Sequence, residues 1–442
     1  MTSISEPPKG LHAVIPRSDH TLSRGILSPA ALKVLQGLSD AGFRALLVGG
    51  GVRDPLLGIK PKDFDVATDA TPEQIHRLFK RSRIIGRRFQ IVHVRDGRET
   101  IEVSTFRAST ENPPDQAGKD PFQLGSTGQI IRDNKFGSIE EDAFRRDFTV
   151  NALYYDIKDY SLIDYTGGLK DIEQRKLRII GNPLQRYRED PVRMIRAIRL
   201  ASKLAFELSP ETAAPIKENA MLLQDVSPAR LFEEVNKLFL AGYGHETYHM
   251  MLQYGLFAAL FPEANTLIRS DESLQLFISQ ALINSDNRVE QGKPVVPAFL
   301  FSVLLWPQAN QRYQQLIEDG EPPVPALQKA SQMAIAAQQT YVSIPKRFTQ
   351  NIREIWELQP RLVQRRKNRI YPMLEHPRFR AAYDFLLLRE QSGEQLDQAG
   401  QWWTEFQDAN TEQRDELIEA LPGNKRKRSK PRRRKPQGNN NP

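Results

Sequence analysis

The chain of 442 residues contains no cysteine. This absence excludes disulfide bonds, thiol nucleophiles and cysteine-ligated zinc, and it fits a reducing compartment such as the cytoplasm. The first residues show no basic segment followed by an apolar one, so no secretory signal is expected. The longest apolar run, 295–306, contains a proline and is too short to cross a bilayer. It predicts a buried core helix and no membrane segment.

Acidic residues are missing from the region near the C-terminus. The net charge of the chain is +8, and the basic run at 425–435 alone contributes nine positive charges, so the remainder is close to neutral. The run consists of Lys425, Arg426, Lys427, Arg428, Lys430, Arg432, Arg433, Arg434 and Lys435. We expect a disordered tail that binds a polyanion, most commonly nucleic acid. The alternative is a charged run that serves solubility alone.

The pattern of hydrophobic residues changes near residue 180. Before it, short alternating runs predict strands at 44–48, 63–67, 82–85, 89–94 and 100–106, with helices at 28–38, 52–57, 71–79 and 138–153. From residue 182 to 422 helical periods dominate. The sequence therefore predicts an α+β fold with five parts: a loose N-terminus (1–25), a mixed-sheet head (26–180), a helical neck (181–240), a helical body (241–422) and the tail (423–442). Residues 108–129 predict a mobile insertion.

Three consecutive glycines, Gly49 to Gly51, lie between the strand predicted at 44–48 and the helix predicted at 52–57. Glycines at such a turn leave backbone N–H groups free to meet phosphate oxygens. Arg53 is placed to add a positive charge at the same point. The segment therefore favours a triphosphate-binding turn.

Two aspartates, Asp63 and Asp65, belong to the strand predicted at 63–67, where alternation puts them on one face. Adjacent carboxylates repel each other unless a cation lies between them. Two Mg²⁺ ions at such a pair would activate an attacking hydroxyl and hold a triphosphate. Together with the glycines, the pair predicts phosphoryl or nucleotidyl transfer.

These segments resemble the catalytic motif of class II nucleotidyltransferases, the family that joins bacterial poly(A) polymerases and tRNA CCA-adding enzymes. The matching stretches are 47–54, 62–68, 145–152, 164–168, 177–181 and 189–196, in the order of the family's motifs. Gly51 stands where the family usually has another small residue. The resemblance implies a polymerase-β-like head, two Mg²⁺ ions and a nucleoside triphosphate substrate.

The resemblance also assigns roles to individual residues. It makes Asp63 and Asp65 the metal ligands and Asp147 the third catalytic carboxylate, with Glu102 on the strand at 100–106 as the alternative. The expected nucleotide-binding residues are Gly50, Gly51, Arg53, Arg145, Asp190, Arg193 and Arg196. Among these, Asp190 and Arg193 are expected to read the base edge, because the pair offers both acceptors and donors.

Residues 84–94 resemble the segment that marks bacterial poly(A) polymerases rather than CCA-adding enzymes. The resemblance therefore implies addition of AMP from ATP to the 3′ ends of mRNA and other transcripts. We expect the basic residues of the tail to bind this RNA, and we expect a cytoplasmic monomer. A CCA-adding enzyme is the alternative.

Two hypotheses of other classes remain open. His245 and His249 flank Glu246 with the spacing of a zinc hydrolase, but no third ligand is evident. The second hypothesis is a helical RNA-binding protein with an inactive head. The presence of both Asp63 and Asp65 argues against it.

Overall fold

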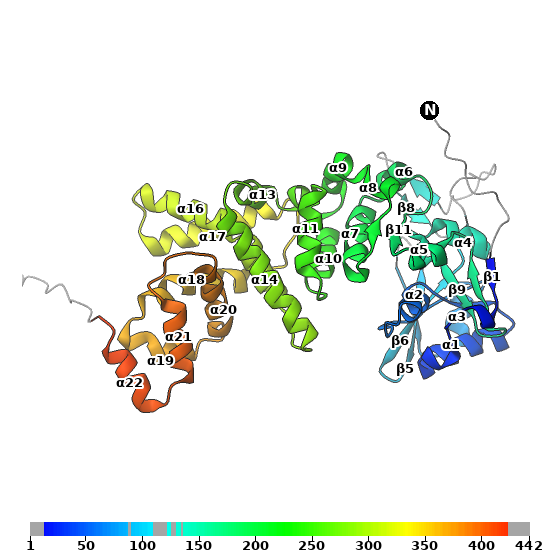
Figure 1. Cartoon of the computed structure of the whole chain (residues 1–442), viewed down its shortest axis with the longest axis horizontal. Coiled ribbons are helices and arrows are strands. Elements are labelled where there is room, and N and C mark those ends of the chain that lie inside the picture. The colour runs from blue at the N-terminus through cyan, green and yellow to red at the C-terminus, as the bar shows by residue number, and fades with distance from the viewer. Residues whose placement is uncertain (1–12, 87–89, 109–121, 125–129, 134–135, 423–442) are drawn as a thin grey trace, which may run out of the picture. The chain divides into compact units, whose positions relative to one another are not determined.

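The computed structural model describes residues 13–86, 90–108, 122–124, 130–133 and 136–422 (Figure 1). Contacts divide the chain into two compact units. The first comprises Met1–Thr266, Leu282–Val295 and Gln338–Ile344, and the second Leu267–Ala281, Val296–Ala337 and Pro345–Pro442. The predicted head and neck thus share one unit, whereas their predicted boundaries stay predictions. The mixed-sheet head followed by helices confirms the α+β fold class.

The head is built on one mixed sheet of eight strands in the order β1-β10-β9-β2-β3-β6-β5-β4. Its strands are β1 (Ala13–Ile15), β2 (Ala45–Val48), β3 (Asp65–Thr68), β4 (Ser82–Ile85), β5 (Ile91–Asp96), β6 (Glu99–Thr105), β9 (Leu153–Asp156) and β10 (Leu162–Asp164). Strands β3 and β6 pair in parallel, and the other neighbours are antiparallel. Strands β7 (Phe122–Leu124) and β8 (Ile130–Asp133) pair separately; β7 lies within the predicted insertion and β8 directly follows it.

Alternation along β5 and β6 decides which face of the sheet is covered. Val92 and Val94 are buried and face the same side as Ile101 and Val103, where α1 (Pro29–Asp40) and α3 (Pro72–Leu78) pack. On the opposite face, α4 (Ile139–Arg145) contributes to a core formed by Leu46, Val48, Ala67, Phe106, Ile139, Ala143, Ala152, Tyr154, Ile163 and Ile180. This second core lies over β2, β3, β9 and β10, and it leaves the polar residues of β5 and β6 accessible.

Side-chain caps fix where three of the helices of the head, α1, α3 and α4, begin. The Ser28 hydroxyl accepts a hydrogen bond from the backbone N–H of Ala31, as its place before a proline predicts. Capping boxes open α3 at Thr71 and α4 at Ser138. Each cap stabilises its helix by about 1 kcal/mol. The predicted helix starts are thereby confirmed.

Several predicted boundaries were wrong. The helix from Ser138 ends at Arg145 instead of continuing to 153, because the Arg146 backbone turns extended while its side chain bonds Asp142 and Tyr154. A 3-10 turn (Thr149–Asn151) and α5 (Gly168–Glu173) follow in the head. A short strand also occurs after residue 182, where none was predicted: β12 (Glu207–Leu208) pairs with β11 (Lys176–Leu177).

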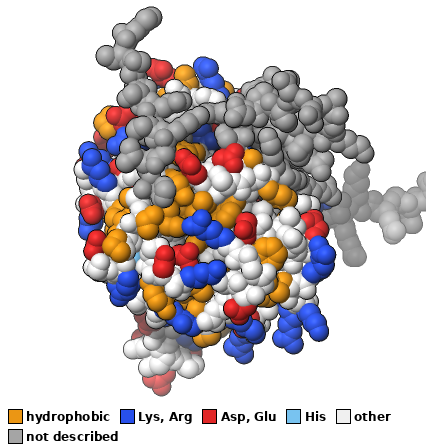
Figure 2. Space-filling model, turned by 90° about the vertical axis from the view of Figure 1, so that its right-hand side faces the viewer, with side chains coloured by type: hydrophobic (Ala, Val, Ile, Leu, Met, Phe, Trp, Pro, Cys, Tyr) orange, Lys and Arg blue, Asp and Glu red, His pale blue; other side chains and the backbone are white. Residues whose placement is uncertain are grey.

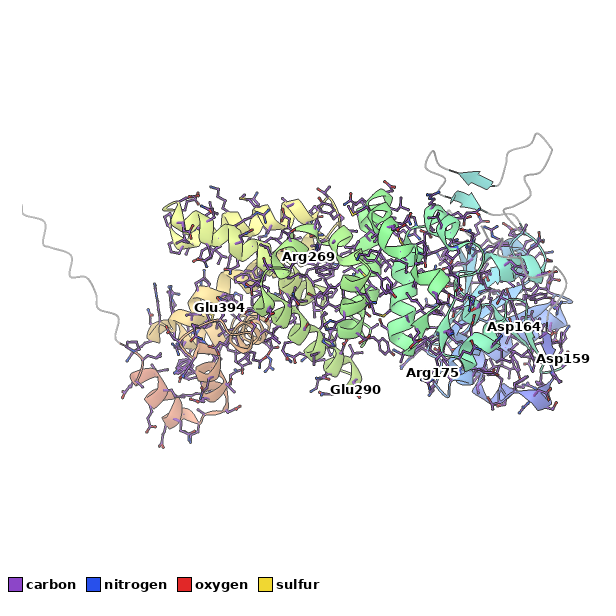
Figure 3. The ribbon with its side chains drawn as sticks, turned by 45° about the horizontal axis from the view of Figure 1, so that its top comes forward. Asp159, Asp164, Arg175, Arg269, Glu290 and Glu394 are labelled. Carbon is purple, nitrogen blue, oxygen red and sulfur yellow. The ribbon has the colours of Figure 1, made fainter. Side chains whose placement is uncertain are left out.

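The remainder of the first unit is helical. Its helices are α6 (Pro183–Glu189), α7 (Val192–Leu204), α8 (Pro210–Ala213), α9 (Ile216–Asn219), α10 (Pro228–Phe239), α11 (Gly244–Gln253), α12 (Leu256–Leu260) and α13 (Pro262–Ile268), the last ending in the second unit. Helix α14 (Glu272–Glu290) has residues in both units. In the head, the carboxylate of Asp164 (labelled in Figure 3) accepts hydrogen bonds from four successive backbone N–H groups, 166–169, and fixes the turn before α5.

The second unit is helical throughout its described part. It contains α15 (Pro297–Leu304), α16 (Trp306–Glu318), α17 (Pro323–Gln338, except its last residue), α18 (Lys346–Gln364), α19 (Ile370–Leu374), α20 (Phe379–Gln391), α21 (Ala399–Asp408) and α22 (Thr411–Glu419). The apolar run predicted to be a core helix is α15, and most of it is buried. Buried Trp356 and Trp403 donate indole N–H bonds to backbone carbonyls. None of the helices described has the length and apolar character needed to cross a membrane.

Candidate active site

The glycine segment lies at the end of β2, directly before α2 (Gly50–Leu56). Gly49 has a φ of 72°, a left-handed conformation that side chains other than glycine rarely adopt. A Cβ atom at Gly49 would lie 3.6 Å from Oδ2 of Asp65, so this backbone approaches the carboxylate closely. Gly50 and Gly51 belong to the first turn of the helix, which begins two residues earlier than predicted.

The acidic pair lies beside this turn. Asp65 is the first residue of β3, whereas exposed Asp63 precedes the strand, so the strand begins two residues later than predicted. Burial and the carboxylate of Glu102, and to a lesser degree that of Asp63, raise the pKa of Asp65 from 3.8 to about 6. Negative charge therefore accumulates here, which is the electrostatic signature of a cation site.

Glu102 is the third carboxylate at this point. It is the register partner of Asp65 across the parallel pair β3 and β6, and its side chain is 47% exposed. His93, the opposite neighbour of Glu102 on β5, approaches it with Nε2 3.7 Å from Oε2. The parallel register thus brings together Asp65 and Glu102, the alternative carboxylate predicted from the sequence.

The three carboxylates do not form a closed metal cage. Across the described residues, no group of three or more His, Asp or Glu side chains converges closely enough to hold a metal ion by itself. Mg²⁺ is commonly held by one or two carboxylates together with water and substrate phosphates, so an open site of this kind fits it. The raised pKa of Asp65 also supports a cation site at this position.

Asp147 lies in a different environment, among arginines. Its carboxylate is 3.0 Å from Nε of Arg193 and 2.6 Å from Arg196, with Arg186 at 4.0 Å. Although burial opposes it, the positive charge of Arg196, Arg193 and Arg186 holds the pKa of Asp147 well below its usual range. No contact between Asp147 and Asp65 is found among the described side chains. The catalytic role of Asp147 stays a prediction.

Arg53 is buried rather than directed outward. Its guanidinium donates hydrogen bonds to Asp54 and to Asn151, and Lys203 of α7 lies 3.1 Å from the same Asp54 carboxylate. Helix α7 continues this pattern one turn earlier, where Arg199 faces Glu234 at 3.6 Å. The basic side chains of α7 are therefore compensated by carboxylates from several elements.

Asp190 lies just before α7, but its side chain does not cap this helix. Instead, both of its carboxylate oxygens accept hydrogen bonds from the guanidinium of Arg230, at 2.9 and 2.8 Å. Arg193 donates to Glu189 at 2.9 Å and to Asp147. The sequence contained no signal for Arg230, because it lies 40 residues from its partner on another helix.

Arg145 lies where positive charge is concentrated. Burial and the guanidinium groups of Arg107 and Arg186 lower the pKa of Arg145 to about 9, and its Nη1 donates to the carbonyl of Ala108 at 2.5 Å. Crowded cations of this kind are relieved by an anion such as a nucleotide phosphate. The predicted residues Arg145, Arg193 and Arg196 thus form one region around Asp147.

The zinc-hydrolase hypothesis finds no support in the geometry. His245 and His249 contact each other through their Nε2 atoms at 3.0 Å on α11, and no third ligand joins them among the described residues. Burial lowers the pKa of His245.

Several predicted sites lie outside the described residues. They are residues 87–89 of the segment 84–94, most of the insertion at 108–129, and the predicted RNA-binding tail with Lys425, Arg426, Lys427, Arg428, Arg432, Arg433 and Arg434.

Three family models match the chain. The poly A polymerase head domain covers residues 45–178, a probable RNA- and SrmB-binding site of polymerase A covers 205–268, and the arginine-rich C-terminus of polymerase A covers 319–437.

Known proteins show the same relationship. Poly(A) polymerase I of Salmonella typhimurium is 46% identical over 96% of this chain and 92% of its own length, and that of Escherichia coli O157:H7 is 47% identical over the same shares. The CCA-adding enzyme of Bacillus subtilis is 39% identical over only 52% of this chain and 55% of its own length. In fold, the chain resembles the Thermotoga maritima CCA-adding enzyme complexed with tRNA (TM-score 0.57, 18% identity, 90% of this chain and 95% of that one). The chain therefore belongs to the bacterial poly(A) polymerase family of nucleotidyltransferases.

Proposed function

We propose that this protein is a template-independent polynucleotide adenylyltransferase, which adds AMP from ATP to the 3′ end of RNA and releases pyrophosphate. The structural observation that carries the proposal is the convergence of Asp65 and Glu102 beside the Gly49 turn, with Asp63 directly ahead of the strand. Relatives that span nearly the whole chain are named poly(A) polymerase I, which supports adenylate addition over CCA addition.

In the proposed reaction, the 3′-hydroxyl oxygen of RNA forms a bond to the α-phosphorus of ATP, and the bond from that phosphorus to the pyrophosphate oxygen breaks. Asp63, Asp65 and Glu102 would hold Mg²⁺, with two ions as the expected number. Bound Mg²⁺ would favour ionisation of the attacking hydroxyl and neutralise charge on the triphosphate. Gly49 contributes by letting the backbone approach the phosphates without a side chain in the way.

Nucleotide choice falls to the arginine region of the first unit. Arg145 and Arg196 are expected to contact the sugar and phosphates of ATP, while Arg193 and Asp190 read the base. In the structure, Asp190 is paired with Arg230, and Arg193 is paired with Glu189. Nucleotide binding would have to break one of these pairings so that the side chain can bond to the base edge. Selection by protein groups explains why no nucleic-acid template would be needed.

The substrates are then RNA 3′ ends of mRNA and other transcripts. We propose that the protein works as a monomer, and that it works in the cytoplasm, a reducing compartment with which the lack of cysteine agrees.

The test is incorporation of each nucleoside triphosphate separately into an unstructured RNA primer with Mg²⁺. ATP alone should give long homopolymers, and Asp63→Asn or Asp65→Asn should abolish extension in a folded protein. Glu173→Gln removes an exposed carboxylate of α5 and serves as the matched control, with unchanged activity. A discrete CCA product on tRNA lacking its end would favour the alternative enzyme. Extension by the folded Asp63→Asn/Asp65→Asn double variant would refute the metal site.

A further inference from the structure

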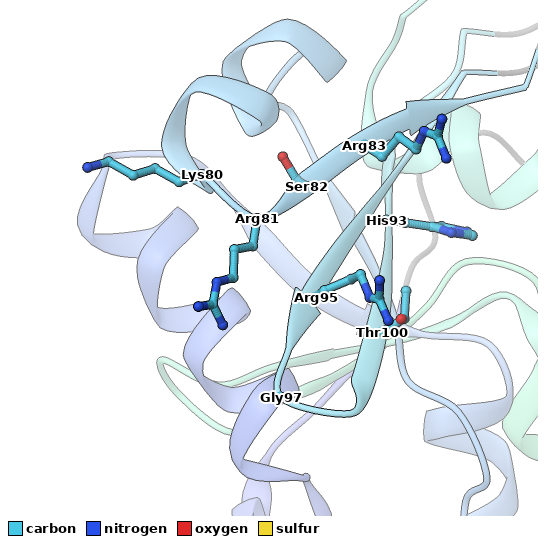
Figure 4. A pocket seen from close by; sticks show the side chains of 8 residues that line it. All are labelled: Lys80, Arg81, Ser82, Arg83, His93, Arg95, Gly97 and Thr100. Atoms are coloured by element: carbon cyan, nitrogen blue, oxygen red, sulfur yellow. The ribbon is translucent and has the colours of Figure 1, made fainter.

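A cavity of about 750 Å³ opens on the half of the head sheet that carries β4, β5 and β6 (Figure 4). It is lined by Lys80, Arg81, Ser82, Arg83, His93, Arg95, Gly97 and Thr100. Arg83, His93 and Arg95 extend from β4 and β5 toward the same side. No acidic side chain lines this cavity, which we call the β-hairpin pocket.

The positive charge of the β-hairpin pocket is uncompensated. Within the described part of the chain, Lys80, Arg81, Arg83 and Arg95 form no salt bridge, and all four are exposed. Of the acidic residues in the same hairpin, Asp96 is bound to Lys33 and Glu99 to Ser28, whereas Glu102 lies at the border of the pocket, 3.7 Å from His93. On the face of the head drawn in Figure 2, by contrast, acidic, basic and apolar side chains are interspersed.

Strand register connects this pocket to the acidic site. Asp65 pairs with Glu102, Glu102 with His93, and His93 with Arg83, so these four residues form one row across β3, β6, β5 and β4. Neighbouring strands lie about 4.8 Å apart, so the row spans about 14 Å from Asp65 to Arg83. Arg95, paired with Thr100, lies in the next row on the same face.

The direction of this row bears on where the RNA would lie, because nucleotidyl transfer is an in-line displacement. The Gly49 turn follows β2, on the side of β3 away from β6, and the proposed triphosphate lies there. The attacking hydroxyl has to approach the α-phosphorus opposite the leaving pyrophosphate. With the triphosphate on the Gly49 side, an RNA strand that enters from the side of Glu102 would have the phosphates upstream of its 3′ end over β5 and β4.

We propose that the β-hairpin pocket binds the phosphodiester backbone of the RNA immediately upstream of the 3′-terminal nucleotide. Arg83 and Arg95 contact phosphates, and His93 lies between them and the acidic site. This proposal rests on the proposed adenylyltransferase function and assigns the path of its RNA substrate. A site this close to the reacting end differs from a distant tether, because it orients the 3′-hydroxyl as well as raising affinity.

The test compares the Arg83→Ala/Arg95→Ala double variant with the wild type and with Arg98→Ala. Arg98 is exposed in the same hairpin but does not line the pocket, so its variant controls for simple charge loss. Binding of a single-stranded RNA with a 3′-deoxy end is measured by fluorescence anisotropy without ATP, between 50 and 200 mM salt. Two lost phosphate contacts should make the slope of log affinity against log salt shallower by about 1.4. Over this fourfold salt range, the difference is a factor of about seven.

Steady-state kinetics supply the second readout. In the double variant the KM for RNA should rise while the KM for ATP stays unchanged, and the thermal unfolding temperature should match that of Arg98→Ala. A raised KM for ATP with unchanged RNA binding would show that the pocket holds the triphosphate instead, and it would overturn the proposal. Equal effects of both variants would overturn it too. A wild type that binds RNA with the expected slope but incorporates no ATP would refute the proposed function and leave the binding site standing.

Discussion

Replacing Asp65 by asparagine should stabilise the metal-free protein at neutral pH. The fold raises the pKa of this carboxyl from 3.8 to about 6, so it favours the protonated form. At about 1.4 kcal/mol per pKa unit, ionising Asp65 costs the folded state about 3 kcal/mol at most. The side chain is half-buried, so solvent screening reduces this figure, and we expect a gain of about 1–3 kcal/mol in the free energy of unfolding.

The upward shift in the pKa of Asp65 determines the pH range over which the two proteins differ in stability. Because the folded pKa lies above the unfolded one, the stability that the protonated group contributes is fully present below about pH 4 and is lost as the pH rises through about 6. Wild type and Asp65→Asn should therefore unfold alike near pH 4, diverge between about pH 4 and 6 and differ by a constant amount above that, with the variant higher in Tm by about 2–10 °C.

The assay is thermal unfolding of both proteins in EDTA from pH 4 to 8, repeated at pH 8 with Mg²⁺. Magnesium should stabilise the wild type and leave Asp65→Asn nearly unaffected, because the variant lacks the charge that attracts the ion. The reasoning is refuted if Asp65→Asn is no more stable than the wild type at pH 8 in EDTA. Equal responses of the two proteins to Mg²⁺ would separately contradict the metal site.

Four further predictions concern other residues. Glu102→Gln should slow extension by about 100-fold or more, by analogy with single lost groups in other active sites, and single-turnover kinetics will show it. Asp147→Asn should lower the free energy of unfolding at pH 7 by about 3–5 kcal/mol, with the loss shrinking as the pH falls through the depressed pKa, as urea titrations at pH 7 and pH 3 will test. Arg193→Ala should weaken discrimination of ATP from CTP by about 1–3 kcal/mol in competition assays. Deleting 425–442 should make the salt slope of RNA binding shallower by about 3.5 if about five charges engage, and an unchanged slope would leave solubility as the role of the tail.

The sequence suggested the pair Asp63 and Asp65 but could not rank a third carboxylate. The spacing of Asp63 and Asp65 behind the glycines is local, so it can be recognised without a structure. Glu102 lies in another strand, and alternation showed only that it faces away from Ile101 and Val103. Its place beside Asp65 depends on the parallel register of β3 and β6, which a helix and two further strands separate in the chain. Pairings of this kind are set by the folded sheet.

In the arginine region around Asp147, too, the sequence did not predict the contacts that the structure shows. Asp190 lies just before α7, yet its carboxylate binds Arg230 of α10, three helices after α7, instead of capping the helix start. Similarly, the helix from Ser138 stops early because Arg146 binds Asp142 and Tyr154. Charge-assisted bonds prevailed over the propensity signals in both places, between distant residues at Asp190 and between near neighbours at Arg146.

Strand β4 is an edge of the head sheet, since in the described structure it pairs with β5 alone. Exposed backbone donors and acceptors at such an edge invite pairing with another chain, and basic side chains are a common protection against it. Arg83 stands in this strand and Arg81 directly before it, so the residues that face the proposed RNA also guard the sheet against aggregation. A variant that loses these charges would then be limited by self-association as well as by weaker substrate binding. RNA bound over this edge would then also protect the enzyme from self-association at high protein concentration.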